Sequence, residues 1–188
     1  MKFESLALQG LILICPRRYG DHRGWFSETY SRRVYADHGI GMEFVQDNHS
    51  LSGPKGTVRG LHFQGPPHAQ HKLVRCTRGA IFDVAVDIRR GSPTYGEWLG
   101  YELSAENGRQ LFIPVGFAHG FVTLRPDSEI VYKCSDYYAP ETEGSVRWDD
   151  PAIGIEWPLS DLPVLSGKDT EALLLAALDS PFLWEEAA

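Results

Sequence analysis

The chain has 188 residues, which suits one domain long enough to bury a sizeable core. Apolar residues make up 43% and charged residues 23%, as in ordinary soluble globular proteins, and 19 glycines with 12 prolines favour a turn-rich β fold. A net charge of −7 argues against a nucleic-acid surface, although a local cluster of basic residues could still bind an anionic ligand.

We expect neither a membrane-spanning segment nor an export signal in this sequence. The longest early apolar run, 11–15, is too short to span a bilayer, and polar residues interrupt any signal-peptide core. The three cysteines, Cys15, Cys76 and Cys134, are an odd number without metal-type spacing. We therefore expect free, buried thiols in a protein of the reducing cytoplasm.

The beginning of the chain predicts short strands and one short helix. Residues 1–15 indicate one or two strands, broken near Gly10. The stretch 17–24 is polar and contains glycine, so we expect a loop there. A helix is expected over 31–39, where Ser31 stands at the N-cap position and a glycine follows the last turn.

The middle of the chain predicts many short strands at close spacing, separated by glycine, proline, asparagine or aspartate. This pattern indicates an all-β antiparallel sandwich or barrel. No repeat or linker divides the sequence, so we expect a single domain over 1–188, with a helical tail from about 169 to 188 that includes an apolar helical pattern at 170–178. The expected strands are 43–50, 57–63, 71–77, 80–89, 96–103, 110–113, 117–124 and 128–135.

The strand at 80–89 has the clearest alternation. Phe82 and Val84 share one face with further apolar residues, while Asp83 and Asp87 share the other. The face with two acids meets either solvent or a polar cavity, and the strand alone leaves both interpretations open.

Two histidine motifs stand out, although either histidine alone could be a packed core residue. His62 lies on a short apolar segment that a Gly-Pro-Pro turn ends, and His119 completes Gly-x5-Pro-x-Gly-x2-His at 108–119, the second sequence motif of cupins. The first cupin motif supplies a His-x-His pair and a glutamate as metal ligands. Here 62–64 is His-Phe-Gln, no glutamate follows at the expected spacing, and Lys72 lies nearby, so we expect no bound metal.

With further segments, these motifs resemble one cupin family, the RmlC-type nucleotide-sugar epimerases. The resemblance runs from about Gly20 to Asp169, and it is specific because many separate segments occur in the right order. It implies a cupin jelly-roll with a few short peripheral helices, a homodimer, and catalysis without a cofactor. The matching segments are Asp21–Glu28, Gln46–Ser50, Val58–Gln64, Lys72–Val74, Phe82–Asp87, Ile113–Phe121, Val131–Lys133, Trp148–Pro151 and Leu165–Asp169.

The resemblance implies inversion of C3 and C5 in dTDP-4-keto-6-deoxy-D-glucose to give dTDP-4-keto-L-rhamnose, a step of dTDP-L-rhamnose biosynthesis. Each inversion removes a proton beside the C4 carbonyl, forms an enolate and returns a proton to the opposite face. This chemistry needs a base, an opposing acid and a cation or donor at the enolate oxygen. The resemblance assigns these roles to His62 as the base, Asp169 as its orienting carboxylate, Tyr132 as the acid and Lys72 at the C4 oxygen.

From the residue pattern alone, three of these roles have structural alternatives. Asp169 could simply cap a C-terminal helix. Tyr132 alternates with apolar neighbours like a core aromatic, and Lys72 could be a solvated strand residue.

The resemblance also implies the residues that bind the nucleotide. Guanidinium groups suit phosphate because they donate two parallel hydrogen bonds. Arg23 and Arg59, with Lys168, would hold the diphosphate, while Tyr138 would stack on the thymine. Further residues expected near sugar, base or phosphate are Glu28, Gln46, Asn48, His119 and Glu143, with Tyr19, Phe26 and Asp83 as additional lining of the site.

Arg59 and His62 cannot both reach one cavity from a regular strand, because positions three apart face opposite sides. We therefore predict an irregularity between them, with Gly60 as the site of a bulge.

Three other functions remain open. The closest is a mono-epimerase that inverts only C3 or only C5 of a related nucleotide sugar, although Tyr132 favours the double epimerase. A metal cupin such as a dioxygenase is disfavoured by Gln64 and Lys72. A non-catalytic sugar-binding cupin would be expected to lack His62 or Tyr132, and both are present.

Overall fold

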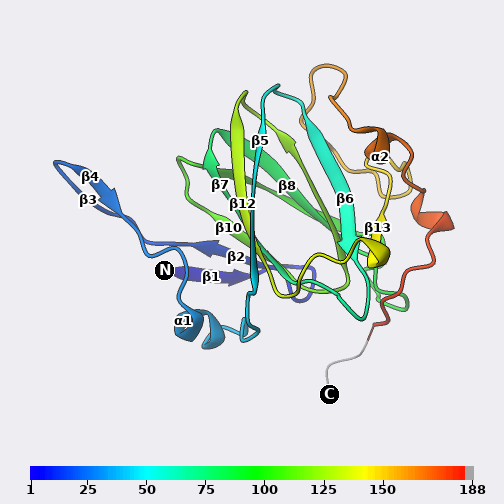
Figure 1. Cartoon of the computed structure of the whole chain (residues 1–188), viewed down its shortest axis with the longest axis horizontal. Helices are drawn as coiled ribbons and strands as arrows, with labels where there is room; N and C mark the ends of the chain where they lie inside the picture. The colour runs from blue at the N-terminus through cyan, green and yellow to red at the C-terminus, as the bar shows by residue number, and fades with distance from the viewer. Residues whose placement is uncertain (185–188) are drawn as a thin grey trace.

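The computed structural model describes residues 1–184 and shows two antiparallel sheets packed face to face (Figure 1). Within these residues the larger sheet has six strands in the order β1-β2-β10-β7-β12-β5, and the smaller sheet has five in the order β13-β6-β11-β8-β9. This is the all-β jelly-roll that the sequence predicts. The elements are β1 (Lys2–Ser5), β2 (Ile12–Cys15), β3 (Tyr19–Asp21), β4 (Gly24–Phe26), α1 (Arg32–Ala36), β5 (Gln46–Ser52), β6 (Val58–Gln64), β7 (Lys72–Arg78), β8 (Ala80–Asp87), β9 (Trp98–Ser104), β10 (Gln110–Ile113), β11 (Phe117–Thr123), β12 (Ser128–Cys134), the 3-10 turn η1 (Pro140–Thr142), β13 (Glu143–Ser145), α2 (Gly167–Thr170) and the 3-10 turn η2 (Leu175–Ala177).

The core lies between the two sheets, where every second residue of a strand points inward. Val74 and Leu111 from the larger sheet pack in one cluster with Ile81 and Leu103 from the smaller sheet, and all four are inaccessible to solvent. Burial of such side chains is the main stabilising contribution, at roughly 25 cal/mol per Å² of apolar surface. The packed core fixes the two sheets relative to each other. It therefore also fixes the positions of the residues that face the space between the sheets.

The strands predicted between 43 and 135 all form, with ends shifted by up to three residues. Gly10 separates β1 from β2 with a φ of 101°, as the predicted break requires. The helix predicted at 31–39 has Ser31 at its N-cap as expected but is shorter at its other end, because α1 stops at Ala36 and the chain turns up to Gly39, which has a φ of 85°.

The continuous helix predicted over 170–178 is wrong. A single turn, α2, is followed by an extended stretch and then by η2. The backbone groups that a helix would pair internally bind a neighbouring loop instead: the Leu173 carbonyl accepts from the Arg147 N–H, and the Leu175 N–H donates to the Asp150 carboxylate. Tertiary hydrogen bonds therefore override the local apolar periodicity.

The helical tail was predicted to continue to residue 188, and its last part, 185–188, lies outside the described residues. None of the helices in the described part of the chain is long and apolar enough to cross a membrane.

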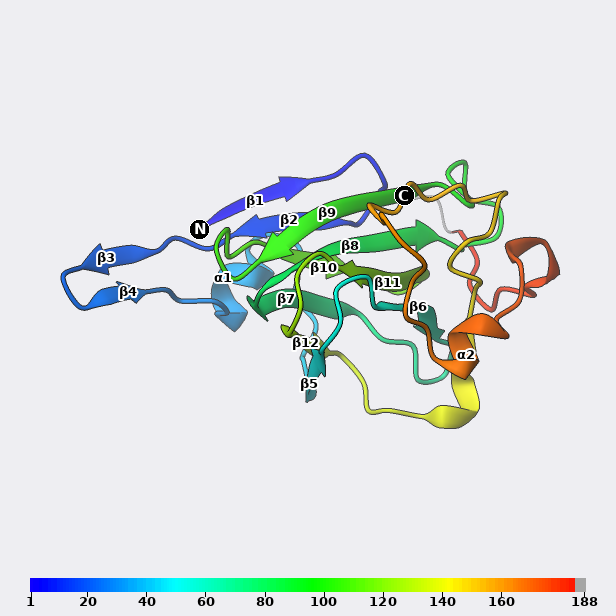
Figure 2. The same ribbon diagram turned by 90° about the horizontal axis from the view of Figure 1, so that it is seen from above.

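The stretch predicted as a loop at 17–24 belongs to a hairpin, β3–β4, that projects from the body of the sandwich (Figure 1, Figure 2). Arg18 holds the base of the hairpin: it donates to two carbonyl groups after β9 and lies 4.2 Å from the centre of the Trp25 ring. Tyr19 pairs with Phe26 across the two strands, and both side chains are exposed. The hairpin thus presents aromatic surface away from its own core.

The predicted irregularity at Gly60 is present. His62 pairs with His119 of β11 and Arg59 pairs with Phe121, so β6 advances three residues where β11 advances two. Gly60 has a φ of 127°, and a Cβ there would lie 2.5 Å from the β11 backbone, which no side chain tolerates. The extra residue turns both Arg59 and His62 toward the same cavity.

Candidate active site

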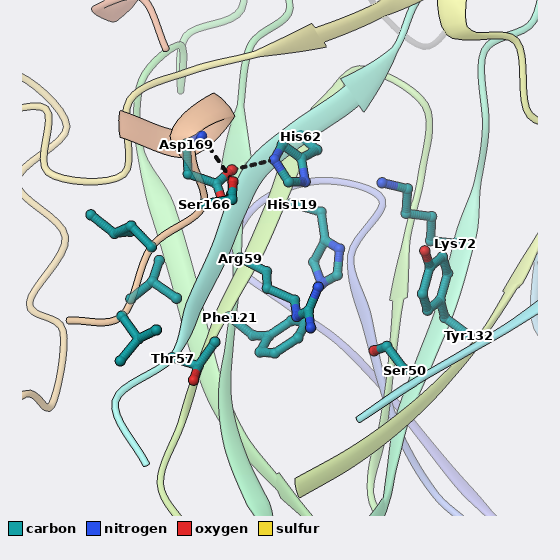
Figure 3. A pocket seen from close by; sticks show the side chains of 13 residues that line it. Ser50, Thr57, Arg59, His62, Lys72, His119, Phe121, Tyr132, Ser166 and Asp169 are labelled. Carbon is teal, nitrogen blue, oxygen red and sulfur yellow. Dashed lines mark hydrogen bonds and ion pairs between the residues drawn. The ribbon is translucent and has the colours of Figure 1, made fainter. Parts of the chain in front are cut away.

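A cavity of about 390 Å³ lies between the two sheets (Figure 3). Strands β6 and β11 form one wall, strands β5, β7 and β12 form the opposite wall, and the segment that enters α2 closes a third side. Sheet positions hold most of its side chains, so their relative placement is rigid. The chemically reactive lining consists of Arg59, His62, Lys72, His119, Tyr132 and Asp169.

His62 and Asp169 form a close pair in this cavity, with His62 Nε2 2.6 Å from Asp169 Oδ1. The Asp169 side chain is only 3% exposed, whereas that of His62 is 29% exposed. The hydroxyl of Ser166 donates to Asp169 Oδ2 at 2.8 Å and accepts from the Asp169 N–H, which caps α2. Asp169 therefore both contributes to the helix cap and orients His62, so the two sequence interpretations of this residue are compatible.

Burial opposes ionisation of Asp169, but hydrogen bonds from His62 and Ser166 outweigh it and hold the pKa of Asp169 below its ordinary value. The carboxylate is thus charged at neutral pH. A charged carboxylate at Nε2 favours the tautomer in which Nε2 carries the hydrogen. The other ring nitrogen of His62, Nδ1, is then the one that can accept a proton.

Lys72 and Tyr132 stand on the larger sheet, across the cavity from His62 (Figure 3). Burial lowers the pKa of the Lys72 ammonium, and nearby acidic groups, Asp83 and Glu143 among them, only partly oppose this. Those two carboxylates have partners of their own: Asp83 is hydrogen-bonded to His119, and Glu143 pairs with Lys168. Burial raises the pKa of the Tyr132 hydroxyl above its ordinary 10.0, so the phenol is protonated and can donate a proton.

Arg59 and His119 add two basic groups to the wall formed by the smaller sheet. Arg59 is held at the rim, where Nε donates to Ser52 Oγ at 3.1 Å and Nη2 donates to the Leu51 carbonyl at 3.2 Å. His119 Nε2 lies 2.8 Å from Asp83 Oδ1. Asp83 was expected to line the site, but its side chain is fully buried behind His119. The sequence left open whether the acidic face of this strand meets solvent or a polar cavity. The Asp83 side chain does neither directly, because it is buried and contacts the cavity residue His119.

A smaller cavity of about 100 Å³ adjoins the main one, and His62, Lys72 and Tyr132 line both. Gln46, Asn48, Tyr138 and Glu143 line it. The Tyr138 hydroxyl donates to Glu143 Oε2 at 3.0 Å, Lys168 Nζ lies 2.5 Å from Glu143 Oε1, and the Gln46 amide bridges the Tyr138 N–H and Asn48. Five residues predicted to bind substrate therefore form one hydrogen-bonded network beside the main cavity.

Six predicted residues line neither of these two cavities: Asp83 and Lys168, described above, and also Tyr19, Arg23, Phe26 and Glu28. Arg23 is paired with Asp21 at 2.5 Å and its side chain is 77% exposed. Phe26 is 69% exposed at the end of the hairpin. Tyr19, Arg23 and Phe26 belong to the projecting hairpin, whereas Phe26 and Glu28 line a separate cavity that Tyr132 also lines.

Gln64 occupies the place of a metal ligand in the cupin motif and has a structural role here. Its amide nitrogen donates to the carbonyls of His68 and Tyr137, and its amide oxygen accepts from the Ala139 N–H. These bonds tie the proline-rich turn after β6 to the segment before η1. In the described residues, 1–184, no group of three or more His, Cys, Asp or Glu side chains is suited to hold a metal ion.

Ser50, Phe121 and Ser166 also line the main cavity and were not singled out from the sequence. Ser166 could have been found, because Ser-x-x-Asp is the spacing of a helix-capping box. A serine or an aromatic residue within a strand carries no comparable signal, since either can face the core or the cavity.

A jelly-roll cavity that sets an oriented histidine against a phenol and an ammonium group defines a cupin equipped for proton transfer. The sequence profile of the dTDP-4-dehydrorhamnose 3,5-epimerase family matches residues 5–177. The chain therefore belongs to this family of isomerases, which confirms both the family and the fold predicted from the sequence.

Individual relatives agree with this assignment. A protein named dTDP-4-dehydrorhamnose 3,5-epimerase from Sinorhizobium fredii is 54% identical over 182 residues, which cover 97% of this chain and 93% of the relative. One of the same name from Salmonella typhimurium is 55% identical, with 90% and 92% covered. The crystal structure of the RmlC epimerase from Legionella pneumophila, in complex with dTDP-4-keto-L-rhamnose, has a TM-score of 0.93 at 47% identity and covers 100% of this chain and 99% of its own.

Proposed function

We propose that this protein inverts C3 and C5 of dTDP-4-keto-6-deoxy-D-glucose and releases dTDP-4-keto-L-rhamnose for dTDP-L-rhamnose biosynthesis. The observation that carries the proposal is the placement of His62 and Tyr132 on opposing sheets with one cavity between them. A sugar ring bound there would present one face to the imidazole and the other to the phenol. Membership of the epimerase family and the product bound to the Legionella relative support the same substrate class.

Each inversion then consists of two proton transfers. His62 takes the proton from the carbon beside the C4 carbonyl, and the electron pair of the broken C–H bond moves onto the C4 oxygen as an enolate. Tyr132 gives its proton to the opposite face of the same carbon while the carbonyl reforms. His62 then holds the substrate proton and Tyr132 has lost its own, and exchange with solvent restores both groups for the second centre.

Lys72 stabilises the intermediate of both steps. Its ammonium group would lie at the C4 oxygen, where it interacts more strongly with an enolate than with a ketone. Removal of one such preorganised donor typically costs about 3 kcal/mol of transition-state stabilisation. The buried setting strengthens this interaction, because the local dielectric constant is lower than that of water.

The diphosphate is assigned to the end of the main cavity at Arg59 and His119, since both present nitrogen donors that suit phosphate oxygens. The network of Gln46, Tyr138 and Glu143 offers hydrogen-bonding groups to the rest of the substrate. Stacking of Tyr138 on the thymine and contact of Lys168 with the diphosphate stay predictions.

We also propose that the chain folds as one domain, acts as a homodimer and works in the cytoplasm. The free state of all three cysteines in the described chain suits a reducing compartment. The exposed aromatic residues of the β3–β4 hairpin are of the kind that protein interfaces bury. A second copy would bring Arg23 and Glu28, which the family resemblance places near the substrate, and Phe26, expected as further lining, to the cavity of its partner.

Light scattering of the purified protein should give twice the 21.1 kDa mass of the chain. A double variant that replaces Trp25 and Phe26 by serine should shift the mass toward the monomer and weaken dTDP binding, because both side chains would leave the interface. A monomeric wild-type protein with full activity would contradict the dimer.

Turnover of dTDP-4-keto-6-deoxy-D-glucose in heavy water should place deuterium at both C3 and C5 of the product. The label enters because Tyr132 exchanges its hydroxyl hydrogen with solvent before each proton is returned. Proton NMR and mass spectrometry of the product measure the label at each position. Label at one centre only would replace the proposal by the mono-epimerase, and no label would exclude both.

The Tyr132→Phe variant separates the acid from the base in the same experiment. Phenylalanine keeps the packing of β12 and removes only the hydroxyl, so His62 should still exchange the substrate protons with solvent. Inversion should fall by about 10²-fold, within the range of a lost general acid. Double inversion at the wild-type rate would show that another group returns the proton.

A further inference from the structure

We propose that Asp83 is a positioning residue. Its buried carboxylate orients His119 and stabilises the positively charged imidazolium, and this imidazolium binds an anionic oxygen of the nucleotide diphosphate. This rests on the proposed function, because it assigns the diphosphate of that substrate to one side chain. It gives a role to a charged residue that touches no solvent and lines neither cavity of the site.

The pair is built on two neighbouring strands, β8 and β11, at the centre of the smaller sheet. Asp83 Oδ1 accepts from His119 Nε2 at 2.8 Å, and the two side chains are 0% and 9% exposed. Removal of a carboxylate from water is costly, and an apolar residue at this core position would avoid the cost. We therefore expect the carboxylate at position 83 to have a functional role in addition to filling space in the core.

The bonding of the Asp83 carboxylate differs from that of the other buried carboxylate on β8. Asp83 Oδ2 is buried and has no hydrogen-bond partner in the described residues. Asp87 on the same strand is equally buried, yet its two oxygens accept from Arg89, Ser92 and Thr94. Asp87 thus shows how a structural carboxylate is satisfied in this strand, and Asp83 departs from that pattern: its one hydrogen bond goes to a residue of the active-site cavity.

The hydrogen bond decides which nitrogen of His119 meets a ligand. With Nε2–H directed at Asp83, Nδ1 is the nitrogen that remains for substrate, and His119 lies beside Arg59 in the cavity wall (Figure 3). A carboxylate behind an imidazole also stabilises the imidazolium form, as in other histidine–aspartate pairs. The imidazolium can donate from Nδ1 to a phosphate oxygen, a charge-assisted bond that a neutral ring with Nδ1 unprotonated cannot make.

The two histidine–aspartate pairs of the site then have different tasks. His62 and His119 are direct partners in the β6–β11 ladder, and each is held by its own carboxylate. Asp169 is part of the α2 cap and orients the base that acts on carbon. Asp83 belongs to the sheet itself and orients a cation for the diphosphate, at the end of the cavity that also holds Arg59.

The Asp83→Asn variant tests this role, since asparagine has nearly the same shape and lacks the charge. Calorimetric titration with dTDP should show a dissociation constant raised about tenfold, the size of effect expected when the buried partner of a charged histidine is neutralised. KM for the sugar nucleotide should rise by a similar factor, and kcat should stay within about threefold of wild type. A fall in kcat with unchanged KM would overturn the proposal, as would unchanged dTDP affinity.

A double-mutant cycle shows whether Asp83 acts through His119. The His119→Gln variant alone should weaken dTDP binding by about the same factor, and adding Asp83→Asn to it should change the affinity by less than about twofold. Additive losses would mean that Asp83 acts independently of His119. Because dTDP binding is measured without turnover, this outcome is distinct from a failure of the epimerase assignment.

Asp87→Asn is the matched control, since it neutralises an equally buried carboxylate on β8 that serves no cavity residue. It should lower the thermal unfolding midpoint and leave dTDP affinity unchanged. If Asp83→Asn does not fold, Asp83→Ser takes its place, because serine is smaller and also neutral. Equal losses of dTDP affinity in the Asp83 and Asp87 variants would reduce Asp83 to a structural residue.

Discussion

The His62→Asn variant should lose proton exchange at both C3 and C5, and kcat should fall by about 10³-fold, within the range for a lost general base. Asparagine approximates the size and polarity of the imidazole but cannot take a proton. One base serves both centres in the proposed mechanism, so both exchange reactions should be lost together. Solvent exchange of the substrate C–H groups in heavy water, followed by NMR, measures each centre separately.

Two further variants give this result its meaning. Asp169→Asn should lower kcat by about 10²-fold although His62 itself is unchanged, because a neutral amide replaces the charged carboxylate that orients the His62 ring. His68→Asn is the matched control: His68 also pairs with a carboxylate, Asp136 at 3.2 Å, but lies outside the cavity. Exchange at one centre that survives in His62→Asn would reveal a second base.

The fold was largely predictable because its signals are local. Short alternating segments between turn residues determine where strands begin and end, and each strand expected between 43 and 135 forms. The bulge at Gly60 was also predictable, since two site residues three positions apart require it. The helix expected at 170–178 failed because its apolar pattern was real but its backbone hydrogen bonds go to Arg147 and Asp150, which no local pattern records.

The sequence predicted which residues gather around the cavity better than it predicted which of them contact each other. The family motifs marked His62, Lys72, Tyr132 and Asp169, and the fold gathers them around one cavity. Periodicity placed Asp83 on the polar face of its strand. It could not show whether the Asp83 side chain lines the cavity itself or is buried behind another residue that lines it. The answer depends on which residue of β11 lies between Asp83 and the cavity. That residue is His119, which is 36 positions away along the chain, and no local sequence pattern records such a contact.

The Lys72→Met variant should lower kcat by about 10²- to 10³-fold and leave KM nearly unchanged. Methionine fills much of the same volume without a charge, so the cavity keeps its shape and loses only the partner of the enolate oxygen. An interaction that strengthens between ketone and enolate affects the transition state more than substrate binding. Lys133→Met is the control, because Lys133 pairs with Asp47 at 2.9 Å outside the cavity, and it should retain the wild-type rate.

The pH dependence of kcat supplies a second test of Lys72. Burial lowers the pKa of this ammonium from 10.5, so the wild-type enzyme should lose activity as pH rises through a value below that of an exposed lysine. Tyr132 causes a separate alkaline loss, since burial raises the pKa of its hydroxyl above 10.0 and the phenol must be protonated to act as the acid. The residual activity of Lys72→Met should therefore lack the alkaline loss that Lys72 causes and keep the one that Tyr132 causes. An unchanged alkaline limb in that variant would mean that a group other than Lys72 carries the charge at the enolate oxygen.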